Sequence, residues 1–150
     1  MRQSVASIVL FTRKQGDGRA YLAHWNRPWQ CFALVGGHKH DDESHRQCAI
    51  REAVEELDVN AETQLAVDDA PRARLQYTAH SQSARVQTQY TIEVFDGRLR
   101  GDAAEAQALA DPRNRWLTIE EIQAGRCEDG KPIGHTVAMI LTKVDELPSG

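Results

Sequence analysis

The chain has 150 residues, a net charge of −4, 41% hydrophobic residues and 27% charged residues. This balance is that of a globular domain rather than a disordered chain, and the length suffices for one domain with its own core. A duplex-binding module would carry a basic stripe, which the sequence lacks, so we expect no contact with duplex nucleic acid. We therefore predict a single domain over residues 1–150.

The cysteines and the N-terminal segment bear on the cellular compartment. Cys31, Cys48 and Cys127 are odd in number, and their spacing matches neither a zinc site nor a disulfide framework. They predict free thiols in a reducing cytosol, so we expect a cytoplasmic protein. The apolar stretch near the N-terminus is too short for a membrane span and too interrupted for a signal peptide, so no membrane association is expected.

The first part of the chain predicts strands. Residues 4–12 are β-branched and apolar, which favours a buried strand. A turn at 15–18 leads into a second strand at 20–25. An extended run resumes at 30–35, and a pair of glycines ends it.

The middle of the chain combines a helix with a hairpin. Ser44 and Gln47 form a capping box, which predicts that a helix runs over 45–57. Two extended stretches follow, at 72–80 and 84–97. In the second stretch every other residue falls on one face, as a strand requires, and we predict that the two pair as a hairpin.

The last part of the chain predicts two helices. Residues 101–114 are expected to form a loop or a short helical turn. The capping box of Thr118 and Glu121, with Gly125 after it, predicts a short helix. The final helix is predicted over 133–147. Its apolar stripe consists of Val137, Ile140, Leu141, Val144 and Leu147. Because strands come first and also lie between helices, we predict an α+β fold, an α/β/α sandwich with a mixed β-sheet flanked by helices.

The helix predicted over 45–57 separates its residue types. Successive helical residues turn by about 100°. The apolar side is expected to hold Ile50, Ala53, Val54 and Leu57. Glu52, Glu55 and Glu56 are expected to fall together on the opposite side, where three carboxylates repel one another and Arg51 offsets only part of the repulsion. Such a face is either a solvated polar surface or a site for hard divalent cations, which prefer oxygen ligands.

The residues around these glutamates resemble the Nudix box, G-x5-E-x7-R-E-U-x-E-E-x-G-U, in which U is a bulky aliphatic residue. The glycine, acid and arginine positions of that pattern are filled by Gly37, Glu43, Arg51, Glu52, Glu55 and Glu56, and the last aliphatic position by Val59. Three positions depart from it. Ala53 is smaller than the usual aliphatic residue, Val35 stands where many members have proline, and Asp58 replaces the glycine after the helix. That last position is expected to need a left-handed backbone, which Asp tolerates better than most residues.

The resemblance implies a hydrolase that cleaves a diphosphate linkage in a small nucleotide-like molecule, such as a nucleoside triphosphate, a nucleotide sugar or a dinucleoside polyphosphate. It implies Mg²⁺ as the cofactor, with Mn²⁺ able to substitute. The metal ligands that it implies are Glu52, Glu55, Glu56, the carbonyl of Gly37 and Glu43. The three helix glutamates are also the expected catalytic residues, with Arg51 orienting them. Glu52 ranks before Glu105 as the general base. The alternative is a Nudix-shaped module that senses a nucleotide without cleaving it. Homodimers are common among similar proteins, so a homodimer is a further expectation.

Residues within the box and on either side of it are candidates for binding the substrate. His38 or Lys39 is expected to touch a substrate phosphate, and Trp29 and Tyr77 are candidates for stacking on a base or for a place in the core. The loop over 38–43 is rich in histidine and aspartate, which leaves a zinc site open as an alternative to a polar loop at the site mouth. The zinc peptidase pattern H-x-x-E-H is not met, because the second histidine comes one residue too late.

Overall fold

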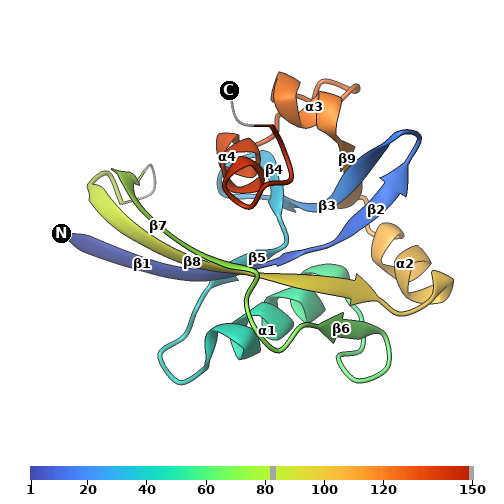
Figure 1. Cartoon of the computed structure of the whole chain (residues 1–150), viewed down its shortest axis with the longest axis horizontal. Helices are drawn as coiled ribbons and strands as arrows, with labels where there is room; N and C mark the ends of the chain where they lie inside the picture. The colour runs from blue at the N-terminus through green and yellow to red at the C-terminus, as the bar shows by residue number, and fades with distance from the viewer. Residues whose placement is uncertain (82–83, 149–150) are drawn as a thin grey trace.

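Two β-sheets with helices packed around them form the structure (Figure 1), a computed structural model that describes residues 1–81 and 84–148. The predicted α+β architecture, a mixed sheet flanked by helices, is confirmed. No helix in the described part of the chain is long and apolar enough to cross a membrane. The three cysteines are free, as predicted, and the structure buries all of them.

The first sheet is built around β8 (Gln87–Leu99). On one side β8 pairs in parallel with β1 (Arg2–Leu10), which in turn pairs antiparallel with the edge strand β5 (Gly36–His38). On its other side β8 pairs antiparallel with β7 (Ala73–His80) and, further along, with β6 (Leu65–Val67). The predicted hairpin is therefore confirmed as β7 and β8, whereas β5 and β6 were not predicted; the connection between β7 and β8 includes residues outside the described ranges.

The second sheet is built around β3 (Gly18–Asn26). It pairs antiparallel with β2 (Thr12–Gln15), with β4 (Cys31–Leu34) and, on its other edge, with β9 (Asn114–Thr118). The strands predicted at 20–25 and 30–35 are thus confirmed, with small differences at their ends.

The segment predicted as one strand over 4–12 contributes to both sheets. The amide of Val9 donates to the carbonyl of Val35 at 2.9 Å, while the carbonyl of Phe11 accepts a hydrogen bond from the amide of Leu22 at 3.1 Å. The chain thus leaves the first sheet and enters the second within three residues, which brings the two sheets together at this point.

Four helices lie in the described ranges: α1 (His45–Leu57), α2 (Asp102–Leu109), α3 (Ile119–Ala124) and α4 (His135–Lys143). In Figure 1, α1 covers the lower face of the first sheet and α4 lies above it, beside β4. The helix predicted over 45–57 and the short helix after Thr118 are confirmed. Of the loop or short helical turn expected over 101–114, the helical alternative is correct for Asp102–Leu109, although α2 is longer than a single turn; it buries Ala104 and Ala108.

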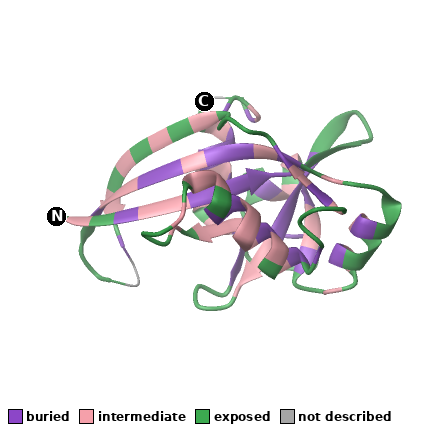
Figure 2. Cartoon of the chain, turned by 90° about the horizontal axis from the view of Figure 1, so that it is seen from below, coloured by how far each residue is buried: buried purple, intermediate pink, exposed green. Residues whose placement is uncertain are grey.

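The predicted apolar stripe of the last helix is buried along its whole length, although α4 itself ends at Lys143. Alternation along β1 divides the core in two, since neighbouring residues of a strand point to opposite faces. Ile8 and Leu10 pack with the α4 side, and Val9 packs with the α1 side. Figure 2 shows the buried residues concentrated in the strands and the exposed ones in the connecting loops.

Candidate functional site

The ends of α1 are fixed by its own sequence. The Ser44 hydroxyl accepts a hydrogen bond from the amide of Gln47 at 3.1 Å, and the Gln47 side chain accepts one from the amide of Ser44 at 2.8 Å. At the other end Asp58 adopts the left-handed conformation, with φ 54° and ψ 47°. The expectation for Asp58 is confirmed, and the helix therefore presents its glutamates from a defined position.

The predicted faces of α1 need one correction. Ala53 and Leu57 are fully buried as expected, but Ile50 and Val54 are only partly buried. The fully buried face also includes Cys48 and Ala49, so the helix is rotated relative to the predicted wheel. As a result, Glu52 and Glu56 face the edge strand β5, while Glu55 is exposed over 59% of its side chain. The three glutamates therefore do not share one solvated face.

Glu52 lies directly against the backbone of Gly37. A Cβ built on Gly37 would come within 2.5 Å of the carboxyl carbon and one oxygen of Glu52. A residue with a side chain would therefore displace this carboxylate. Gly36, immediately before it, has φ 153°, and a Cβ there would lie 2.2 Å from the carbonyl of Ser7. The glycine pair is required because another backbone and a carboxylate occupy the space of both side chains.

The carboxyl group of Glu56 lies beside that of Glu52. The amide of Gly36 donates to its Oε1 at 3.4 Å. Burial raises the pKa of Glu56 well above its usual range, and a hydrogen bond and the negative charge of Glu52 raise it further. Two carboxyl groups at such short range are stable when they share a proton or a cation, so this pair has the character of a cation site.

Arg51 connects the acids of the box. Its Nε and Nη2 donate to the two oxygens of Glu43 at 3.0 and 2.8 Å, and its Nη1 donates to Glu52 at 3.1 Å. Its Nη2 also donates to the carbonyl of His38 at 3.0 Å. The hydrogen bonds from Arg51 and from the amide of His40 lower the pKa of Glu43 to about 2. Glu43 is therefore a fixed anion, and both of its oxygens accept hydrogen bonds from Arg51. Arg51 in turn holds the carboxylate of Glu52 in place.

The donor set suits a cation that needs few protein ligands. Within residues 1–81 and 84–148, no three His, Cys, Asp or Glu side chains are already arranged to enclose a metal ion. Glu52 and Glu56 converge beside the backbone of Gly36 and Gly37, whereas Glu55 lies 3.5 Å from Arg51. Mg²⁺ is commonly held by one or two carboxylates together with water and substrate phosphates. The oxygens at this place fit such a cation, and the histidines do not join them.

A buried network behind β5, which sequence reasoning missed, supports the backbone of Gly37. The Cys48 thiol contacts the carbonyls of Gly37 and His38, each at 3.5 Å. Burial raises the pKa of this thiol, although a hydrogen bond with Ser7 opposes the shift. Ser7 also lies 2.9 Å from Nδ1 of His45. The buried thiol therefore acts as a neutral donor that fixes the Gly37 carbonyl.

The contact between Ser7 and His45 extends to Glu93, whose carboxylate lies 3.3 Å from Nε2 of His45. Serine, histidine and an acid in this order are the residue types of a nucleophilic triad. Ser7, however, is fully buried, so no substrate can reach its hydroxyl. The three residues instead join β1, α1 and β8 beneath the site.

A cavity of about 380 Å³ opens on the other side of Gly36 and Gly37. Three of the predicted substrate-binding residues line it: His38, Trp29 and Tyr77. Trp29 is 43% exposed, as expected for a residue at the cavity mouth. Further lining residues that the sequence did not single out include Tyr90, Thr136 and Ile140. The Tyr77 and Tyr90 rings stack with centroids 5.0 Å apart and planes 18° from parallel, giving the cavity an aromatic wall.

Two predicted residues are not part of this arrangement. The Lys39 ammonium donates to the carbonyl of His40 at 3.2 Å, and Lys39 does not line the cavity. Glu105, the second choice for a general base, accepts hydrogen bonds from Arg13 at 3.0 Å and from Trp116 at 2.9 Å. It lines a separate cavity of about 230 Å³, because α2 turns it toward β2 and β9. Glu105 is therefore ruled out as a neighbour of Glu52.

Comparison with known proteins identifies the family. The family model described as the NUDIX domain matches residues 1–135. No curated protein matches the sequence. Among solved structures, the Nudix hydrolase RenU from M. smegmatis is 22% identical, with a TM-score of 0.56 over 95% of this chain and 84% of that one. A NUDIX hydrolase from Nitrosomonas europaea is 20% identical, with a TM-score of 0.61 over 96% of this chain and 89% of that one.

NrtR from Shewanella oneidensis is also similar, at 13% identity and a TM-score of 0.67. The match covers 96% of this chain but 62% of NrtR. At these identities the three structures support the fold of the chain and not a particular activity.

Proposed function

Because the chain belongs to the Nudix family, we propose that it is a divalent-metal-dependent hydrolase that cleaves a diphosphate linkage in a nucleotide-like substrate. The observation that carries this proposal is the pair of carboxyl groups, Glu52 and Glu56, beside the backbone of Gly37. The same glycine lines a cavity with an aromatic wall. In this proposal the cation at the carboxyl pair and the base in the aromatic cavity lie on either side of Gly37, which suits a nucleotide diphosphate.

The residues that would hold the metal are Glu52, Glu56 and the carbonyl of Gly37. Glu55 is a further ligand in this proposal, since its side chain is 59% exposed and would reach the pair by giving up its 3.5 Å contact with Arg51. Glu43 contributes through Arg51 rather than by direct contact, because Arg51 engages both of its oxygens. When bound, Mg²⁺ or Mn²⁺ supplies the positive charge that offsets the charge of the diphosphate.

The chain's own residues supply positioning and proton transfer. Glu52 is the proposed general base, which accepts the proton of the attacking water, and Arg51 holds its carboxylate in place. Trp29 and Tyr77 are proposed to contact the base in the aromatic cavity, and His38 to contact a phosphate from its rim. Lys39, the next residue along the chain, is a further proposed phosphate contact. Phosphoryl transfer depends mainly on such positioning and on charge stabilisation.

The second candidate function is nucleotide sensing without cleavage. It is favoured by the similarity to NrtR, whose NUDIX domain has been crystallised with ADP ribose and which has also been crystallised with a 27mer DNA. ADP ribose contains a diphosphate, so both functions call for the same class of small molecule. We favour the hydrolase because a module that only binds has no need for two mutually repelling carboxyl groups beside Gly37.

The test is Glu56→Gln, assayed by product release from a panel of nucleotides with Mg²⁺ or Mn²⁺. Gln has the shape of the protonated acid but no negative charge, so it is a much weaker metal ligand than the carboxylate, and the rate should fall by about 100-fold or more. Thermal unfolding should show an intact fold and a loss of the metal-induced rise in Tm.

Glu62→Gln is the matched control, since Glu62 is an exposed glutamate that lines neither Gly37 nor its cavity. It should retain both the rate and the metal response. An unchanged rate in Glu56→Gln would overturn the hydrolase assignment. Binding of a nucleotide without turnover under any metal condition would favour the sensing module.

A further inference from the structure

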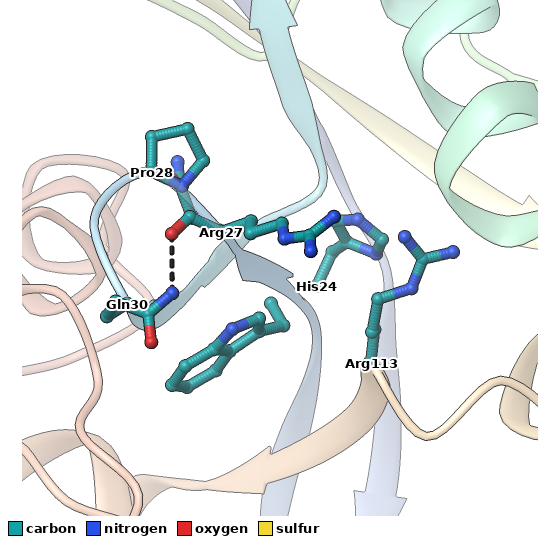
Figure 3. A pocket seen from close by; sticks show the side chains of 7 residues that line it. His24, Arg27, Pro28, Gln30 and Arg113 are labelled. Carbon is teal, nitrogen blue, oxygen red and sulfur yellow. Dashed lines mark hydrogen bonds between the residues drawn. The ribbon is translucent and has the colours of Figure 1, made fainter.

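A second cavity, of about 460 Å³, lies beside the loop between β3 and β4. Figure 3 shows the side chains of Arg27 and Arg113 extending toward His24 within it. Trp25 also lines this cavity. Its residues are thus two arginines and a histidine around an indole ring, and no carboxylate is among the described residues that line it.

Both arginines of this cavity keep hydrogen-bond donors that an anion can use. The Arg27 side chain is exposed and makes no hydrogen bond or ion pair within the described part of the chain. Arg113 is paired with Asp111 through Nε and Nη2, which leaves Nη1 without a partner there. Nδ1 of His24 lies 2.7 Å from Oδ1 of Asn114, which fixes the orientation of its ring.

This cavity adjoins the proposed active site in two ways. Asn26 and Pro28 line both it and the aromatic cavity at Gly37. The Asn114 side chain, which holds His24, also donates to the carbonyl of Glu56 at 3.1 Å. A substrate that occupies the aromatic cavity therefore lies next to the cationic one.

We propose that the cavity of His24, Arg27 and Arg113 binds a phosphate group of the substrate other than the diphosphate that is cleaved. This inference rests on the proposed function and deepens it by naming the substrate class. Arginine donates several hydrogen bonds to a phosphate, and these charge-assisted bonds are stronger than neutral ones. Nucleoside triphosphates and longer polyphosphates carry such a group, whereas a nucleotide sugar with an uncharged sugar does not. The cavity thus favours phosphate-rich substrates.

The first experiment measures calorimetric binding of inorganic pyrophosphate in the presence of a chelator. Without metal the glutamates repel the anion, so binding reports on the cationic cavity and not on catalysis. Arg27→Gln and Arg113→Gln should each weaken binding by about tenfold, as expected for the loss of a hydrogen bond to a charged group. Arg100→Gln is the control, since Arg100 is an exposed arginine that lines neither cavity, and it should bind like the wild type.

The second experiment compares the KM of a nucleoside triphosphate with that of a nucleotide sugar. In Arg27→Gln the KM of the nucleoside triphosphate divided by that of the nucleotide sugar should rise by about tenfold, because binding of the extra phosphate is lost. The corresponding ratio of kcat values should change little. Arg100→Gln should keep the wild-type ratio.

Three results would overturn the inference: equal pyrophosphate affinity in wild type and Arg27→Gln, an equal loss in Arg100→Gln, or an unchanged KM ratio. Absence of hydrolysis with the expected pattern of pyrophosphate binding would refute the proposed hydrolase and leave the phosphate site standing.

Discussion

The carboxylate of Glu52 lies where the side chain of residue 37 would be if that residue were not glycine. A Cβ on Gly37 would come within 2.5 Å of the Glu52 carboxyl carbon. The two residues are far apart in the box, on β5 and α1, and this contact joins the edge strand to the helix. It also places the carboxylate beside the Gly37 backbone, whose carbonyl Cys48 holds from behind.

Gly37→Ala should therefore damage activity more than stability. The group that must move is the end of a flexible side chain, so the free energy of unfolding should fall by less than about 1 kcal/mol. Displacing the carboxylate by about 1 Å should lower kcat/KM by about 100-fold. Steady-state kinetics and urea unfolding measure the two effects.

Gly18→Ala is the matched control, since a Cβ there would meet nothing closer than 4.0 Å. It should retain the wild-type rate. A fully active Gly37→Ala enzyme would show that the position of Glu52 beside Gly37 does not matter for the reaction.

Arg51→Lys should lower kcat/KM and the affinity for metal together. The planar guanidinium reaches both oxygens of Glu43 and also Glu52, and an ammonium group cannot make this arrangement. Loss of a residue that orients metal ligands typically costs 10- to 100-fold, and we expect about that loss in both quantities. Activity measured against Mg²⁺ concentration tests this.

Glu43→Gln should produce a smaller loss in the same direction, because Arg51 keeps its hydrogen bond to Glu52. If Arg51→Lys lowered the rate while leaving the dependence on Mg²⁺ unchanged, Arg51 would act on the substrate and not on the metal ligands.

Glu146 should make the stability of the protein depend on acid pH. Burial raises its pKa, but hydrogen bonds from Arg72 at 2.6 Å and Tyr21 at 2.7 Å outweigh burial and hold the pKa below the ordinary 4.5. A carboxylate with a lowered pKa in the folded state stabilises the fold fully above its unfolded value, and this contribution is lost as the pH falls through the folded value. Glu146→Gln should be less stable than the wild type at pH 7, and the difference should shrink below about pH 4.5.

Urea unfolding at several pH values between 3 and 7 checks the behaviour of Glu146. Glu62→Gln is again the control, since Glu62 is exposed, and its difference from the wild type should be small at every pH. A stability difference for Glu146→Gln that stays constant down to pH 3 would contradict the assigned role of the ion pair with Arg72.

Local sequence determined the frame that carries the site. The capping box of Ser44 and the left-handed position at Asp58 define the ends of α1, because both depend on residues within one helical turn. The box residues Gly37, Glu52 and Glu56 could also be recognised from the sequence, by their spacing along the chain. The buried stripe of the last helix followed from its helical period.

Tertiary structure decided how those residues are used. The wheel placed Glu55 with Glu52 and Glu56, but packing against the sheet rotates α1 so that Glu55 is exposed. Tyr90 joins Tyr77 in the aromatic wall because β7 and β8 pair them directly in register. Arg27 and Arg113 share a cavity because β9 pairs with β3.

The sequence by itself thus determined which residues are chemically capable of forming the site, since spacing and capping are local. Only the tertiary structure decided which of them meet, because pairing and packing join segments that are distant along the chain.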